Sequence, residues 1–159
     1  MNKDFIWGVA TSAYQIEGAE NDGGRGESIW DSKYTKGKVL GDMNGSVACD
    51  HYHRCEEDVA LLKKLGIKNY RFSVSWPRIM PSGKGEVNAE GVEFYKNLVN
   101  RLIDADITPW VTIYHWDLPR KLFEEGGFLN DKISDYFAEY AKTVVEIFGD
   151  KVTNYFIFN

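Results

Sequence analysis

The chain has 159 residues, a length that predicts one domain with enough chain to bury a hydrophobic core. With 19 basic and 24 acidic residues its net charge is −5, and the lack of a basic block argues against nucleic acid or an anionic membrane surface as partner. No apolar run reaches the roughly 20 residues that cross a bilayer, and no apolar signal core follows Met1, so we expect a cytoplasmic protein.

The first part of the chain is predicted to be a strand followed by loops. Residues Phe5–Thr11 are apolar and predict a buried first strand, and Tyr14–Gly18 is predicted as the end of this strand, where it finishes in hydrogen-bonding groups. Asn21–Gly26 and Tyr34–Gly45 are rich in Gly, Asn and Asp, which indicates loops. The glycines in these loops follow no phosphate-binding pattern.

An amphipathic helix is predicted from about Asp50 to Leu65, because its apolar residues recur at three- and four-residue intervals. Asp50 suits the N-cap of this helix, and Gly66 suits a left-handed stop. A second strand, Tyr70–Trp76, is expected next, and Pro77 breaks the chain after it.

The rest of the chain repeats this alternation. Asn88 is predicted to cap a second helix, strand Thr108–Tyr114 follows, a third helix runs from about Asp131 to Gly149, and Val152–Asn159 is a fourth strand. The face of the second helix that points inward is expected to hold Val92, Tyr95, Leu98, Val99, Leu102 and Ile103. Alternating strands and helices predict an α/β fold with a parallel sheet, in one domain over residues 1–159 without an internal boundary.

Polar or ring-bearing side chains lie on or after the four strands. Gln15 follows the first strand, Arg71 and Trp76 lie on or after the second, His115 and Trp116 follow the third, and Asn159 ends the fourth. The carboxyl ends of parallel strands meet at one edge, where amide, imidazole and indole groups suit sugar hydroxyls. Each residue also has a purely structural explanation: Gln15 or Asn159 could satisfy turn backbone, and Arg71 could face solvent or pair with a buried acid.

The run Cys49–Cys55 holds two Cys and two His and is therefore a candidate metal site. Its spacing fits none of the paired Cys patterns of structural zinc, and on a helix only His51 and Cys55 would share a face. We therefore expect no metal, and instead an ordinary His and Cys surface or one member that lines the site. A disulfide between Cys49 and Cys55 is not expected in a cytosolic chain.

Four segments then carry a resemblance to a known family: FIWGVATSAYQIEGA (5–19), ACDHYHRCEEDVALLKKLGIKNYRFSVSWPRI (48–79), VTIYHWDLP (111–119) and NYFIFN (154–159). In this order they resemble glycoside hydrolase family 1, the β-glucosidase family. The fold of that family is a (β/α)8 TIM barrel, so the resemblance implies that this chain forms about the first four βα units, a half-barrel.

The resemblance implies roles for five matching residues. Gln15 and His115 would hydrogen-bond sugar hydroxyls in the innermost subsite, which Trp116 would line. Asn159 would hold the 2-hydroxyl in a contact that strengthens in the oxocarbenium-like transition state. Arg71 would steady the nucleophilic carboxylate.

The match also has departures. The acid/base Glu of the family directly follows the Asn that matches Asn159, and the nucleophilic Glu lies later, so neither catalytic residue is present in this chain. Tyr155 and Ile157 replace residues that are usually Trp and Thr. By the same resemblance, Asp117 and Glu17 are supporting groups rather than catalytic ones.

The implied function is hydrolysis of terminal β-D-glucosidic bonds with retention of configuration, without a cofactor, by a longer parent enzyme. The chain alone is expected to be inactive, because retention needs two carboxyls about 5–5.5 Å apart. Alternatives are a 6-phospho-β-glycosidase, or a non-catalytic half-barrel that binds sugar or assembles with another half. Open edges and the apolar Val152–Asn159 also predict self-association or pairing with a carboxyl-terminal half.

Overall fold

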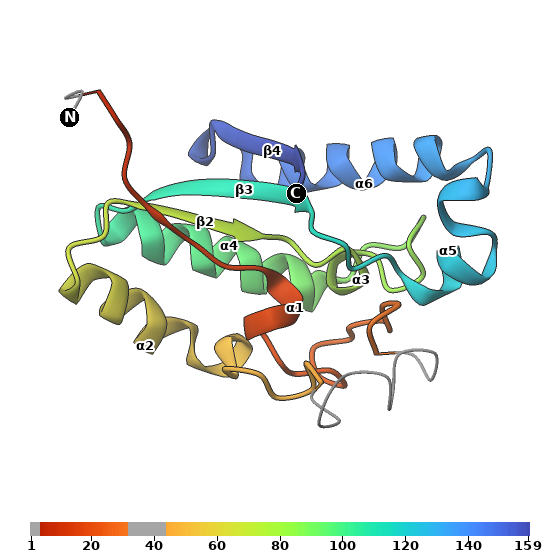
Figure 1. The fold of residues 1–159 in the computed structure, drawn as a ribbon, viewed down its shortest axis with the longest axis horizontal. Coiled ribbons are helices and arrows are strands. Elements are labelled where there is room, and N and C mark those ends of the chain that lie inside the picture. Colours follow the sequence, from red (N-terminus) through yellow and green to blue (C-terminus); the bar gives the residue numbers. More distant parts are fainter. Residues whose placement is uncertain (1–3, 32–43) are drawn as a thin grey trace.

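A computed structural model describes residues 4–31 and 44–159 of the chain. In this part of the chain four parallel strands form one sheet in the order β1-β2-β3-β4, and the connecting helices pack along it (Figure 1). The strands are Val9–Ala10 (β1), Asn69–Ser73 (β2), Thr108–Tyr114 (β3) and Asn154–Phe158 (β4). The helices are Ala13–Ile16 (α1), His51–Lys64 (α2), Trp76–Ile79 (α3), Ala89–Asp104 (α4), Arg120–Glu124 (α5), Gly127–Leu129 (η2), Ile133–Phe148 (α6) and Gly149–Lys151 (η3).

The two faces of the sheet differ because successive side chains on a strand point to opposite sides. One set of side chains packs with α2, α4 and α6 into a single hydrophobic core, to which Phe72, Val111 and Ile113 belong. The alternate set includes Arg71 and Thr112, whose side chains bond to each other across β2 and β3. The helix-covered face therefore stabilises the fold, and the other face is left to carry polar groups.

Several predicted boundaries are confirmed. Strand β3 spans the predicted Thr108–Tyr114. Asn88 caps α4, and its side chain accepts a hydrogen bond from the Glu90 backbone N–H at 3.3 Å. Gly66 follows α2 with a φ of 71°, a left-handed conformation that glycine adopts without a Cβ clash.

The predicted cap of α2 is correct in place but not in chemistry. Asp50 is the N-cap residue, yet it has a φ of 56° and makes no side-chain cap hydrogen bond. Its carboxylate bonds to Nδ1 of His53 at 2.6 Å instead. The side chain of Asp50 therefore closes the first turn through another side chain rather than through the backbone.

The prediction for Phe5–Thr11 is wrong in length and in burial. Only Val9–Ala10 pairs with β2, and Phe5, Ile6 and Trp7 are more than half exposed. In the described part of the chain β1 is an edge strand with a neighbour on one side only. Apolar composition predicted burial here, but burial requires a covering layer that these residues do not contact.

Two further assignments are corrected. Tyr14–Gly18 was predicted as the end of a strand, but Ala13–Ile16 forms the short helix α1, a single turn too brief to show a helical period. Trp76 was assigned to the second strand but begins α3, where Pro77 fits the first helical turn. The predicted loop Tyr34–Gly45 lies almost wholly outside the described residues.

The inward face of α4 is mostly as predicted. Tyr95, Leu98, Val99 and Leu102 are buried, whereas Ile103 is 43% exposed and was wrongly included. Phe94, which was not predicted, is buried in its place. None of the helices in the described ranges is long and apolar enough to span a bilayer.

Gly91 in α4 gives a testable stability prediction. A Cβ at this position would lie 2.2 Å from the backbone oxygen of Arg78, which is too close for any real contact. We expect Gly91→Ala to lower the free energy of unfolding by about 1–3 kcal/mol, because overpacking outweighs the better helix propensity of alanine. Thermal unfolding followed by circular dichroism measures this effect, with the exposed Lys96→Ala on the same helix as control. An unchanged or raised Tm for Gly91→Ala would contradict close packing of α4 on Arg78.

Candidate functional site

Three of the predicted site residues come together at the carboxyl end of the sheet. Nη2 of Arg71, on β2, donates to Oδ1 of Asn159, which follows β4, at 2.9 Å. Nε1 of Trp116, which follows β3, donates to the backbone oxygen of Asn159 at 3.1 Å. The backbone N–H of Asn159 donates to the carbonyl of Tyr114 at 3.1 Å. The side chain of Asn159 is therefore held by β2, and its backbone is held by β3 and by the turn after β3.

Arg71 is positioned by polar and aromatic contacts rather than by an acid. Its Nε donates to Oγ1 of Thr112 at 2.8 Å, and its guanidinium lies 4.5 Å from the ring centroid of Phe156. No ion pair of Arg71 occurs among the described residues. In the described part of the chain the arginine that pairs with a buried acid is Arg78, not Arg71. The guanidinium of Arg71 keeps its charge free to act on an anionic group.

His115 presents a neutral ring to this cluster. Burial lowers the pKa of His115, and the nearby positive charge of Arg71 lowers it further. Its Nδ1 is buried and makes no hydrogen bond within the described residues. A neutral imidazole donates from one nitrogen and accepts at the other, which suits a hydroxyl group that also does both.

Trp116 is held in a strained conformation at the surface. Its φ of 72° is unusual for a residue with a side chain, and such strain persists only where neighbours fix it. Nε1 of Trp30 donates to the backbone oxygen of Trp116 at 2.7 Å, and Nε1 of Trp116 bonds to Asn159 as described above. The Trp116 residue is still 55% exposed. The turn therefore exposes an indole ring whose orientation is fixed by hydrogen bonds to both the backbone and the side chain of Trp116.

Gln15 lies on α1 and makes none of the contacts that join the other site residues. Its Oε1 accepts from Oγ of Ser12 at 2.7 Å, and no hydrogen bond joins it to Arg71, His115 or Asn159 in the described part of the chain. The start of α1 is tied to the sheet, because the backbone N–H of Ala13 donates to Oγ of Ser73 at 2.7 Å. Gln15 is exposed, so its amide is accessible to a ligand.

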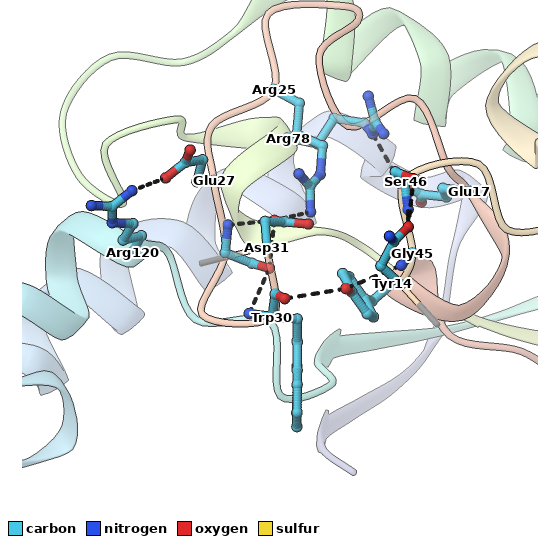
Figure 2. Close-up of polar contacts among 12 residues, drawn as sticks. Tyr14, Glu17, Arg25, Glu27, Trp30, Asp31, Gly45, Ser46, Arg78 and Arg120 are labelled. Atoms are coloured by element: carbon cyan, nitrogen blue, oxygen red, sulfur yellow. Dashed lines mark hydrogen bonds and ion pairs between the residues drawn. The ribbon is translucent and has the colours of Figure 1, made fainter. Parts of the chain in front are cut away.

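A buried polar network lies behind these residues. Nε of Arg78 donates to Oε2 of Glu17 at 2.9 Å, and both side chains are at most 5% exposed. The hydroxyl of Tyr95 donates to Oε1 of Glu17 and accepts from the backbone N–H of Ser75. A second pair joins Arg25 to Asp31, and Figure 2 shows each arginine directed at its carboxylate. These ion pairs fix the loops around the site.

Asp117 is a buried carboxyl without an ion-pair partner in the described ranges. It is 1% exposed, and neither oxygen has a hydrogen bond of good geometry there, although the Ser75 hydroxyl weakly favours its charged form. Burial raises the pKa of Asp117 to about 7, the negative charge of Glu17 adds to this, and Arg25 opposes it. Asp117 therefore changes charge near neutral pH.

This shift predicts a pH-dependent stability. The ordinary pKa of Asp117 is 3.8, so folding favours its protonated form, and that contribution is complete below pH 4 and lost as pH rises to about 7. The loss amounts to about 4 kcal/mol at 1.36 kcal/mol per pH unit. We expect Asp117→Asn, which cannot ionise, to gain in Tm relative to the unmodified chain between pH 4 and 7 and to level off above. A Tm difference that does not vary with pH would exclude titration of Asp117.

The candidate metal run Cys49–Cys55 makes internal contacts instead. Nδ1 of His51 bonds to Asp58 at 2.6 Å, and His53 bonds to Asp50. Cys49 and Cys55 are both free, and burial raises the pKa of the Cys55 thiol to about 11. In the described ranges no group of three or more His, Cys, Asp or Glu is arranged to hold a metal ion.

Sequence reasoning missed the residues that support the site from a distance. Trp30, Thr112, Arg78 and Tyr95 each make a contact across 20 to 86 residues of sequence. One signal was available for Arg78, since it stands between the apolar residues Pro77 and Ile79 directly after the second predicted strand. The others carry no local signal, because their partners are set by the topology.

Comparison with known proteins agrees with this arrangement. The family model for glycosyl hydrolase family 1 matches residues 1–159. Beta-glucosidase A of Acetivibrio thermocellus is 54% identical over 99% of this chain and 35% of its own length, and Beta-glucosidase A of Thermotoga maritima is 51% identical over 98% and 35%. The structure of the Thermotoga maritima β-glucosidase in complex with deoxynojirimycin superposes with a TM-score of 0.95, at 50% identity over 100% of this chain and 36% of that one. The chain thus spans about a third of the relatives that it matches, with the strands and helices of the first half of their barrel. It belongs to glycosyl hydrolase family 1.

Proposed function

We propose that this chain supplies the sugar-recognition side of a retaining β-glucosidase whose catalytic carboxyls come from the remainder of the barrel. The observation that carries the proposal is the contact of Arg71 and Trp116 with Asn159, beside a neutral His115. These side chains come from three successive βα units and meet where β-strands of such barrels carry their active sites. The substrate would be a β-glucoside, and no cofactor is required.

The hydrogen bonds define what each group offers to a sugar. Arg71 occupies Oδ1 of Asn159, so the amide nitrogen of Asn159 is the donor that remains for a hydroxyl. A hydrogen bond to the 2-hydroxyl contributes most as positive charge develops at the neighbouring anomeric carbon. Contacts that strengthen in the transition state raise the rate rather than only the affinity.

Arg71 and Trp116 have different tasks in this proposal. The free charge of Arg71 would stabilise a carboxylate nucleophile placed beside it and keep it ionised. The exposed indole of Trp116 would cover one side of the glucosyl ring. His115 and Gln15 would bind further hydroxyls of the same ring.

The proposal is tested by completing the barrel. Residues 1–159 replace the matching third of the Thermotoga maritima β-glucosidase, and Asn159 is joined to the remainder of that enzyme. We call this chimaera the completed barrel. We expect this completed barrel to hydrolyse p-nitrophenyl β-D-glucoside with retention, and a variant with both Gln15→Ala and His115→Ala to lose most of the activity. A cooperatively folded but inactive barrel would contradict the proposal. Preference for the 6-phosphorylated glucoside would favour a 6-phospho-β-glycosidase instead.

Location of this protein in the cytoplasm stays a prediction.

A further inference from the structure

We propose that Trp30 is a positioning residue that orients the indole of Trp116 toward the glucosyl ring. Trp30 lies between α1 and α2, and its Nε1 donates to the backbone oxygen of Trp116 at 2.7 Å, across 86 residues of sequence. This inference rests on the proposed function, because the orientation of Trp116 affects turnover only if the turn after β3 binds the sugar.

The loop that carries Trp30 is held by its own hydrogen bonds. Oδ2 of Asp31 accepts from the backbone N–H and the hydroxyl of Ser28, both at 2.7 Å, and from Nη2 of Arg25 at 2.8 Å. The backbone N–H of Trp30 donates to the Ser28 hydroxyl at 3.2 Å, and its backbone oxygen accepts from the Tyr14 hydroxyl, on α1, at 3.3 Å (Figure 2). The backbone of Trp30 is therefore fixed without the help of its indole N–H, which acts on Trp116.

The same loop runs antiparallel to the chain that follows the turn after β3. The backbone N–H of Ile29 donates to the carbonyl of Leu118 at 2.9 Å, and the backbone N–H of Arg120 donates to the carbonyl of Glu27 at 2.8 Å. The side chains of Glu27 and Arg120 also form an ion pair (Figure 2). This register places the next loop residue, Trp30, beside the turn itself.

Trp116 has a conformation that requires a fixed partner. Its φ of 72° is left-handed, which costs energy in a residue with a Cβ, and the hydrogen bond from Trp30 offsets this cost while it holds the backbone oxygen. Nε1 of Trp116 in turn donates to the backbone oxygen of Asn159 at 3.1 Å. Without the Trp30 donor, water can satisfy the backbone oxygen of Trp116 but does not fix its direction. Trp116 then relaxes, and its indole turns away from Asn159 and from the sugar.

The first test removes the indole N–H of Trp30 in the completed barrel. Trp30→Phe keeps an aromatic ring beside Tyr14, whose ring centroid lies 6.1 Å from that of Trp30. We expect kcat/KM for p-nitrophenyl β-D-glucoside to fall by about 10- to 100-fold, the usual cost of misplacing a binding group by an ångström. Trp110→Phe is the matched control, because it removes an Nε1 bond to Asn69 of 3.1 Å at the opposite end of β2 and β3. It should leave kcat/KM unchanged.

A double-mutant cycle shows whether Trp30 acts through Trp116. Trp116→Ala removes the indole that Trp30 orients, so adding Trp30→Phe to it should lower kcat/KM by no more than about twofold further. Independent losses that multiply in the double variant would overturn the inference, since Trp30 would then act on the barrel as a whole.

A second readout needs neither activity nor sugar. Hydrogen exchange of the Trp116 indole N–H, assigned with Trp116→Phe, should become at least about tenfold faster in Trp30→Phe, because the bond to Asn159 opens more often. Exchange of the backbone N–H of Val111, in the core of β3, reports opening of the whole barrel and should not change.

Replacing Trp30 by 3-benzothienylalanine provides a variant that keeps the shape of the indole and lacks only the N–H. It should reproduce the faster exchange of the Trp116 indole even if Trp30→Phe does not fold. An unchanged exchange rate of this indole in the benzothienyl variant would overturn the inference. A barrel without turnover contradicts the proposed function alone, and the exchange of the Trp116 indole still decides this one.

Discussion

Replacing Asn159 by alanine in the completed barrel is expected to lower kcat/KM for an aryl β-glucoside by about one to three powers of ten, with most of the loss in kcat. Asn159 is fixed by Arg71, Trp116 and the Tyr114 carbonyl, so its amide nitrogen is held in place as the donor that we propose for the 2-hydroxyl. A donor held in advance where charge develops contributes far more to the transition state than to the bound substrate.

Steady-state kinetics on p-nitrophenyl β-D-glucoside measure this effect, and Cys49→Ser, at an exposed position away from the site, serves as control. A 2-deoxyglucoside adds a sharper comparison. If Asn159 binds the 2-hydroxyl, the variant and the unmodified barrel should differ little on a substrate that lacks this group. Equal losses on both substrates would show that Asn159→Ala acts by disturbing Arg71 or Trp116.

The 159-residue chain by itself is expected to show no turnover and to self-associate. Its described residues leave two sheet edges with a neighbour on one side only, β1 and β4. On β4 the residues Phe156, Ile157 and Phe158 are 41 to 54% exposed, and Trp7 near β1 is 66% exposed. Covering a few hundred Å² of apolar surface stabilises an assembly by several kcal/mol at about 25 cal/mol per Å². In the proposed site, Gln15, His115 and Asn159 bind hydroxyls but do not protonate a leaving group or trap a glycosyl cation.

Sedimentation velocity at tens of micromolar tests the association, and an aryl-glucoside assay of the same sample tests the activity. Ile157→Lys places a charge on the exposed edge strand and should shift the distribution toward monomer, whereas Lys96→Ala on α4 should not. A compact monomer of the unmodified chain, or turnover well above that of a variant with both Gln15→Ala and His115→Ala, would contradict this prediction.

The sequence predicted the elements whose signals are local and long. The Asn88 cap and the period of α4 act within one segment, and β3 is an apolar run with a clear end at Pro119. The edge strand β1 was misjudged because Phe5–Thr11 has the composition of a buried strand but lacks a covering layer. Local sequence determines whether a segment becomes a helix or a strand, whereas its burial depends on what packs over it.

The site divides in the same way. His115 and Trp116 could be proposed as site residues because they follow a predictable strand, and Asn159 because it ends another. The pairing of Glu17 with Arg78 joins residues 61 positions apart and could not be found from spacing. A buried acid beside Arg71 was one of two alternatives, and in the described residues the arginine with such a partner is one turn beyond the strand, on α3. Only the three-dimensional arrangement distinguishes the arginine that stabilises the fold from the one whose charge remains free for a ligand.

Whether this chain recognises a glucosyl unit is decided most directly by a crystal structure of the completed barrel with deoxynojirimycin, a glucose-like iminosugar. We expect the hydroxyls of the ligand to lie within hydrogen-bond distance of the side chains of Gln15, His115 and Asn159, with its ring against Trp116 and with Arg71 still bonded to Asn159. A ligand bound elsewhere, or bound in the barrel without contact to these side chains, would contradict the assignment of the sugar site to this chain.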